Sequence, residues 1–148
     1  MALDFQNDSA IQQAWDDIRK DDSGVNWLLV GYDDNDAKKI KLTGSGSGGL
    51  AELKSNLDDN QVLYGVFKVI GVDQDSRRTK LVFVTWIGSG LSPLKRARTS
   101  THKSAFTQFF NGFHVEIYAS TQDDLTEEDI ISRLNASTGA HKPKSYEF

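Results

Sequence analysis

Residues 77–88 read RRTKLVFVTWIG, and residues 92–99 read SPLKRART. The first segment passes from closely spaced cations into the apolar run 81–84, and such a run predicts a strand at the centre of a sheet. The second segment predicts the start of a long helix. Ser92 can accept from a free N–H group of the first turn, and Pro93 has no N–H that needs a partner there.

The remaining elements follow from hydrophobic spacing on either side of this pair. Ile11, Ala14, Trp15 and Ile18 recur at the interval of one helix face. The patterns predict helices at about 9–22, 50–57, 92–110 and 125–137, and strands at 25–32, 38–43, 61–72, 79–87 and 113–118. Asp8 or Ser9 can cap the first helix, and Thr126 the last. Turns are expected at 33–36 and 73–76, and a flexible loop at 44–49. The predicted order is αββαββαβα in one domain.

Composition excludes several classes of site. The 148 residues contain no cysteine, which excludes a disulfide framework, a thiolate zinc site and a cysteine nucleophile. Four aspartates interrupt the first twenty residues, so no signal peptide is expected. No apolar run approaches the roughly 20 residues that span a bilayer. We therefore expect a cytoplasmic protein, in which the sequon Asn135-Ala136-Ser137 is unused.

Three further patterns could indicate a catalytic or metal-binding site, but each is a weak signal. Gly44-x-Gly46-x-x-Gly49 has the spacing of a dinucleotide-binding turn, but the preceding segment alternates lysine with apolar residues, unlike a buried parallel strand. A flexible loop is the simpler interpretation. Residues 33–36 lack the glycine and closing glutamate of a calcium loop. The three histidines lie on different predicted elements. We expect no metal and no cofactor.

The distribution of charge is more informative than its sum. The chain has 17 basic and 21 acidic residues, for a net charge of −4. Between residues 77 and 103 there is no acidic residue, and seven are basic: Arg77, Arg78, Lys80, Lys95, Arg96, Arg98 and Lys103. This segment predicts a positive surface that attracts an acidic partner.

Helical geometry separates the long helix into two predicted faces. At about 100° per residue, one side carries Leu94, Ala97, Thr101, Ala105, Gln108 and Phe109, and the opposite side carries Lys95, Arg96, Arg98, His102 and Lys103. The first side is expected to face the core. The second is either an ordinary solvated face or a binding surface, and the lack of acidic neighbours at i+4 favours binding.

Segments 77–88 and 94–99 together resemble the core signature of the coactosins, which belong to the actin-depolymerising-factor (ADF)/cofilin family. Further matches are Asp21-Asp22-Ser23-Gly24-Val25-x-Trp27 and residues 127–131. The resemblance implies an α+β fold: a single ADF-homology domain over residues 1–137, with a mixed central sheet of five or six strands flanked by helices on both faces. Residues 138–148 are expected to be a polar, mobile tail.

The resemblance also implies a function. It implies a non-catalytic protein of the cytoskeleton that binds the side of actin filaments, modulates their dynamics without severing and opposes capping. By position, Lys80 is the first candidate contact, with Arg78 and Arg77 beside it. Lys95, Arg96 and Arg98 match the actin-facing helix of the family, and Lys103 lies on the same stripe.

Other functions remain open from the sequence. The alternative within the family is a cofilin-like protein that severs filaments or binds monomers, although the regulatory serine that follows the first methionine of cofilins is absent here. A nucleotide-binding enzyme that uses the glycine segment is a third hypothesis. Weak binding to monomeric actin and to acidic phosphoinositides is compatible with the same basic surface. We expect a monomer that binds no nucleic acid.

Overall fold

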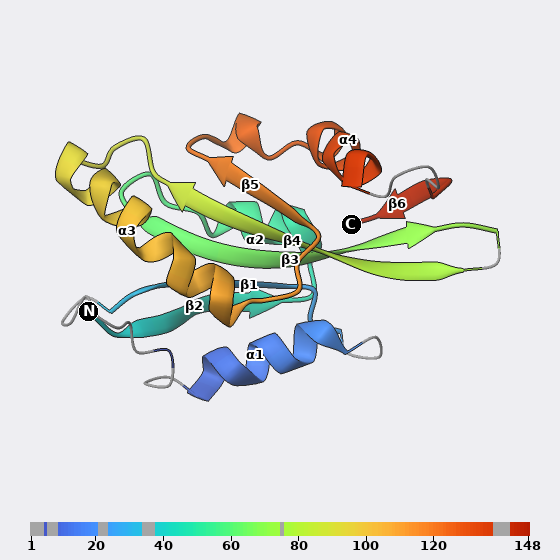
Figure 1. The fold of residues 1–148 in the computed structure, drawn as a ribbon, viewed down its shortest axis with the longest axis horizontal. Coiled ribbons are helices and arrows are strands. Elements are labelled where there is room, and N and C mark those ends of the chain that lie inside the picture. Colours follow the sequence, from blue (N-terminus) through green and yellow to red (C-terminus); the bar gives the residue numbers. More distant parts are fainter. Residues whose placement is uncertain (1–4, 6–8, 21–23, 34–37, 75, 138–142) are drawn as a thin grey trace.

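A single mixed sheet organises the chain (Figure 1). The computed structural model describes residues 5, 9–20, 24–33, 38–74, 76–137 and 143–148, with the backbone alone at 98–100. Five strands lie in the order β2-β1-β3-β4-β5, and β6 pairs with β3 beyond the end of β1. All described pairings are antiparallel except that of β4 with β5, which is parallel. This is the predicted α+β fold with a mixed sheet.

The elements follow the predicted order closely. The helices are α1 (Ser9–Arg19), α2 (Gly49–Ser55), α3 (Pro93–Phe109) and α4 (Glu127–Ser137), with a short 3-10 turn η1 (Gln122–Asp124) before α4. The strands are β1 (Trp27–Tyr32), β2 (Ile40–Gly46), β3 (Val62–Val72), β4 (Arg77–Ile87), β5 (Val115–Ala119) and β6 (Ser145–Glu147). The Ser92 hydroxyl caps α3 and the Thr126 hydroxyl caps α4, as predicted.

Helices cover both faces of the sheet. On one face, α1 packs its predicted stripe, and α3 packs Phe106 and Phe110, against side chains of β1, β3 and β4 such as Tyr64 and Phe83. Stacked and edge-on rings fill this layer, and the Tyr64 and Phe106 centroids lie 3.6 Å apart. On the other face, α2 and α4 cover the second apolar cluster, which includes Trp27, Phe67 and Trp86. With helices on both faces, the central strands are buried on both sides, which explains their uninterrupted apolar sequence.

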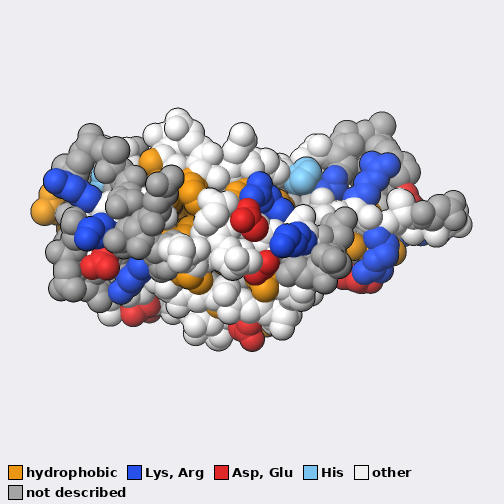
Figure 2. Space-filling view, turned by 90° about the horizontal axis from the view of Figure 1, so that it is seen from below, with side chains coloured by type: hydrophobic (Ala, Val, Ile, Leu, Met, Phe, Trp, Pro, Cys, Tyr) orange, Lys and Arg blue, Asp and Glu red, His pale blue; other side chains and the backbone are white. Residues whose placement is uncertain are grey.

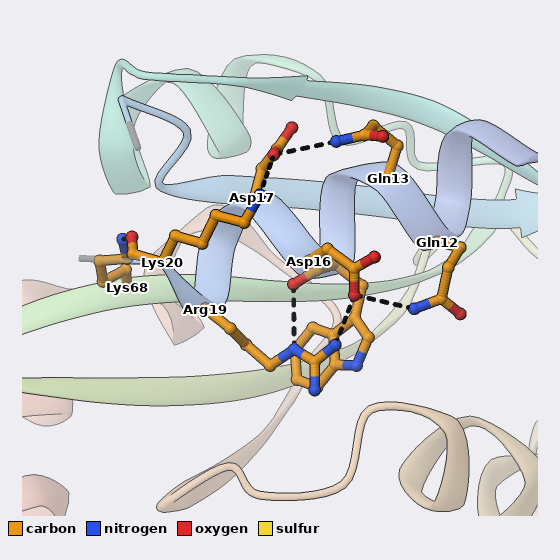
Figure 3. A network of polar contacts seen from close by, with 8 residues as sticks. Gln12, Gln13, Asp16, Asp17, Arg19, Lys20 and Lys68 are labelled. Atoms are coloured by element: carbon orange, nitrogen blue, oxygen red, sulfur yellow. Dashed lines mark hydrogen bonds and ion pairs between the residues drawn. The ribbon is translucent and has the colours of Figure 1, made fainter. Parts of the chain in front are cut away.

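The outer side of α1 carries a ladder of polar contacts (Figure 3). Asp16 accepts hydrogen bonds from Gln12 and Arg19, one turn before and almost one turn after it. The Arg19 guanidinium also lies over the Trp15 ring, 4.6 Å from its centroid. At the end of the helix, the buried Lys68 ammonium donates to the Lys20 carbonyl oxygen at 3.0 Å. These contacts fix the end of α1 against β3.

The paired ends of β3 and β4 project beyond the rest of the sheet (Figure 1). The two strands pair in unbroken register from Val62–Ile87 to Val72–Arg77, whereas β1 pairs with β3 only as far as Phe67. The hairpin turn at 73–76 forms as predicted, since the Asp73 N–H donates to the Ser76 carbonyl oxygen at 2.8 Å. The strand begins at Arg77, two residues before the predicted start, so both arginines belong to the projecting hairpin.

Three expectations need correction or fall outside the described residues. Segment 44–46 is the end of β2, paired with 27–29, and not part of a loop. Strand β6 was not predicted, because three mostly polar residues carry no periodic signal. It occupies part of the predicted tail, whose residues 138–142 lie outside the described part. The cap at Asp8 and most of the turn at 33–36 also lie outside it.

Candidate functional site

Five of the seven predicted basic residues form two groups at opposite ends of β4. Arg77, Arg78 and Lys80 lie on the projecting hairpin, whereas Lys95 and Arg96 lie in the first turns of α3, beyond the other end of the strand. Seven strand residues separate Lys80 from Ile87, which corresponds to about 23 Å. Figure 2 shows Lys and Arg side chains toward both ends of the long axis and also near its middle. The structure therefore contains two separate positive sites.

Strand geometry divides the hairpin cations between two faces. Successive side chains of a strand point to opposite sides, so Arg78 and Lys80 share a face that Arg77 does not. Arg78 and Lys80 line a shallow pocket together with Ser76 and Ser137, beside the end of α4. Arg78 is exposed and Lys80 is half-buried. The sequence predicted one group of three cations, but in the structure only Arg78 and Lys80 lie on the same face of the hairpin.

Arg77 already has an acidic partner within the chain. Its guanidinium forms a two-pronged ion pair with the Glu147 carboxylate of β6. The hydrogen bond raises the pKa of Arg77 and lowers the pKa of Glu147, because each charged form stabilises the other. Both side chains remain more than half exposed. Arg77 is therefore neutralised locally, in contrast to Arg78 and Lys80.

The second site is the start of α3, which extends past the strands (Figure 1). Leu94 and Lys95 are both exposed, Leu94 with 78% of its surface accessible. The Arg96 guanidinium donates to the carbonyl oxygens of Ser89 and Leu91, so it also fastens the loop before the helix. This end of α3 presents a cation next to an unusually exposed apolar side chain.

The predicted division of α3 into faces is partly wrong, although Phe109 packs against the core and Lys95 and Arg96 are exposed as predicted. The inward positions are His102, Phe106 and Phe110, which recur every four residues, while Leu94 and Thr101 are exposed. The His102 ring bonds to the Tyr32 hydroxyl at 2.9 Å, which holds this supposedly outward residue against the sheet. The error has a physical cause: only the second half of α3 lies over the sheet, so Leu94 has no core to enter.

Lys103 and Arg98 are weaker candidates for contact with an external acidic group. Lys103 is half-buried and forms an ion pair with Glu116 of β5. The side chain of Arg98 lies outside the described part of the structure. Among the seven candidates, the described residues give no hydrogen-bond or ion-pair partner to the side chains of Arg78, Lys80 and Lys95. These three cations are the most available for an external acidic group.

The glycine segment does not form a dinucleotide-binding turn. Gly44 and Gly46 belong to an antiparallel strand, whereas such a turn follows a parallel one. The Glu52 carboxylate accepts from the Trp27 indole N–H at 2.7 Å and from the Gly48 N–H at 3.3 Å. A Cβ at Gly46 would lie 2.0 Å from the same carboxylate oxygen. The glycines make room for this buttress, and its negative charge disfavours a phosphate.

The Trp86-Ile87-Gly88 part of the signature has a structural role. The Trp86 indole N–H donates to the Asp58 carbonyl oxygen at 2.8 Å. Gly88 lies so close to the same loop that a Cβ would be 2.1 Å from the Asp59 carbonyl oxygen. These residues therefore fix the loop at 56–61 against the end of β4.

In the described residues, no group of three or more acidic or histidine side chains could hold a metal ion. No helix in the described part of the chain is long and apolar enough to cross a bilayer.

Comparison with known proteins identifies the family. The sequence model of the cofilin/tropomyosin-type actin-binding proteins matches residues 4–135. Coactosin of Dictyostelium discoideum is 35% identical over 131 residues, which cover 88% of each chain. The chain belongs to the coactosins, within the ADF/cofilin family. Its predicted family and fold are thereby confirmed.

Solved coactosin structures show the same architecture. The crystal structure of coactosin from Entamoeba histolytica matches with a TM-score of 0.83 and 27% identity, over 94% of this chain and 99% of the other. The solution structure of mouse coactosin, described as an actin filament binding protein, matches with a TM-score of 0.74 and 28% identity, over 95% of each chain. The fold around both positive sites is thus that of the coactosins.

Two residues at these sites have surroundings that the sequence did not predict: Leu94 is exposed, and Glu147 pairs with Arg77. Leu94 was assigned to the core because it fits the apolar spacing of α3, and only the length of the helix relative to the sheet places it outside. Glu147 was overlooked because its partner is 70 residues away in sequence. No local pattern signals either position.

Proposed function

We propose that this chain binds the side of actin filaments through two contacts, one at each end of β4. The first contact consists of Lys80 and Arg78 on the projecting hairpin, and the second of Lys95 and Leu94 at the start of α3. The observation that carries the proposal is the position of two cations, Arg78 and Lys80, on one face of the β3–β4 hairpin in a chain of this actin-binding family; the described residues give neither side chain an ion-pair partner.

The arrangement suits a large acidic surface better than a small ligand. The two sites are separated by more than about 23 Å of strand, whereas the Debye length at physiological ionic strength is about 8 Å. Each site must therefore make its own contact, and a filament offers many equivalent acidic positions along its side. Exposed ion pairs contribute roughly 0.2–1 kcal/mol each, so affinity is expected to be modest and sensitive to salt.

The finer function is part of the proposal. The mouse relative is described as an actin filament binding protein, which supports binding to filaments. We propose that the chain acts at the cytoskeleton, without catalysis, by occupying the filament side and opposing capping. The cofilin-like alternative would shorten filaments. Fluorescence microscopy of labelled filaments separates the two, because side binding leaves the length distribution unchanged.

Co-sedimentation with actin filaments tests the assigned contact. Lys80→Ala is expected to weaken binding about two- to fivefold at low salt, which corresponds to the loss of one exposed ion pair. Lys39→Ala is the matched control, because it removes one exposed lysine from the sheet edge away from the hairpin. If the Lys80 variant pellets as fully as the parent and the control at every salt concentration, the hairpin is not the contact.

A further inference from the structure

Strand β6 adds a third strand to the projecting hairpin. It pairs with residues 70–72 of β3, on the edge that β1 leaves open after Phe67. The Lys144 N–H donates to the Val72 carbonyl oxygen at 2.9 Å and begins this pairing. Gly71 permits the approach, since a Cβ there would lie 3.0 Å from the Pro143 ring. Residues 143–148, here called the strap, therefore lie directly against the hairpin.

Different residues of the strap perform different tasks. The Tyr146 hydroxyl donates to the Asn135 side chain of α4 at 2.7 Å. Phe148 packs against the apolar cluster beneath α2 and α4. These two residues anchor the strap, whereas Glu147 contacts only the hairpin cation Arg77 among the ion pairs described. The charge of Glu147 can thus be removed while both anchors remain.

The position of Glu147 matters for an acidic partner. It places a carboxylate on the face of the hairpin that carries Arg77, and it uses both prongs of that guanidinium. A second carboxylate cannot form the same two-pronged pair with Arg77 until Glu147 leaves. An unpaired Glu147 carboxylate would in turn repel an acidic surface that came within ion-pair distance of Arg77.

We propose that the strap is an internal competitor of the acidic partner: Glu147 holds Arg77 in an ion pair that a carboxylate of the partner must replace. The strap therefore lowers the affinity of the hairpin, and its release frees Arg77 for a contact from the face opposite to that of Arg78 and Lys80. This inference rests on the proposed function in that the actin filament is the acidic partner.

The test is a double-variant cycle in filament co-sedimentation. Glu147→Gln is expected to raise affinity about three- to tenfold at low salt. Arg77→Ala should weaken binding slightly in the parent, because it leaves Glu147 unpaired, and should cancel that gain in the Glu147→Gln background. Glu128→Gln, on the first turn of α4, is the control for the same change in net charge and should raise affinity by less than twofold. Equal gains from both glutamate variants, or additive effects of the Arg77 and Glu147 changes, would overturn the proposal.

A second measurement separates this inference from the proposed function. The Arg77 side-chain N–H signals are followed by NMR while polyglutamate is added to the parent and to Glu147→Gln. A larger shift of these signals in the variant supports internal competition even if no form of the chain pellets with filaments, in which case only the actin assignment fails. An equal shift in both chains shows that Glu147 does not mask Arg77, whatever the filament result.

Discussion

At the scale of single residues, one buried side-chain group in the described part of the chain lacks a hydrogen-bond partner. Among the described residues, Thr85 is the position whose buried side-chain oxygen has no hydrogen bond, and it lies near the end of β4, between Tyr64 of β3 and Tyr118 of β5, with no accessible surface. Burial of a hydroxyl without a partner costs about 1–3 kcal/mol in proteins. The residue occupies a strand position where a valine side chain of the same shape would fit.

Thr85→Val is therefore expected to raise the free energy of unfolding by about 1 kcal/mol. Urea denaturation followed by tryptophan fluorescence measures the change. Thr79→Val, on the half-buried part of the same strand, is the comparison that should bring less stabilisation. A lower midpoint for the Thr85 variant would mean that the hydroxyl has a partner, such as an ordered water.

At the scale of elements, a histidine links the two parallel strands. The Leu81 backbone N–H donates to the His114 ring nitrogen Nδ1 at 3.1 Å, and the His114 backbone N–H donates to the Leu81 carbonyl oxygen at 2.7 Å. Burial, and then the nearby Lys80 charge, lower the pKa of His114 below its usual value of 6.5. Protonation at Nδ1 would remove the acceptor that satisfies the Leu81 N–H. The start of the β4–β5 pair therefore depends on a neutral imidazole.

This contact predicts a dependence of stability on pH. Because the folded pKa is lowered, the stabilisation is fully present above pH 6.5 and is lost as the pH falls through 6.5 toward the folded value. Urea denaturation at pH 7.5 and 5.5 should show a larger loss for the parent than for His114→Gln, whose side-chain oxygen can still accept. The same loss in both proteins would assign the pH effect to other groups.

The elements also show what the sequence could predict. The hairpin pairing of β3 with β4 followed from one short turn, and the starts of α3 and α4 followed from capping residues, because these are local interactions. The inward face of α3 did not, because it depends on where the sheet ends under the helix. Strand β6 and the Arg77–Glu147 pair depend on contacts over about 70 residues, and no local pattern encodes them. Lys80 is a predicted contact because charge segregation and the family signature coincide there.

At the scale of the whole molecule, the two positive sites are far enough apart to act independently. Lys80→Ala and Lys95→Ala should each weaken filament binding, and the free-energy changes should add in the double variant, because distant sites without shared partners are additive. Co-sedimentation of the parent, both single variants and the double variant measures this. If the double variant binds as well as Lys80→Ala alone, the start of α3 makes no contact and the hairpin is the whole site.

The hairpin of β3 and β4 also has a consequence for the order of folding. Its eleven pairs close around a four-residue connection, so its formation costs little loop-closure entropy. The hairpin ends at Ile87 and β6 ends at Glu147, so β6 joins the hairpin only after 60 further residues have been synthesised. On a ribosome, the hairpin can therefore form while Glu147 is still absent, and we expect its basic surface to be complete before its internal partner exists.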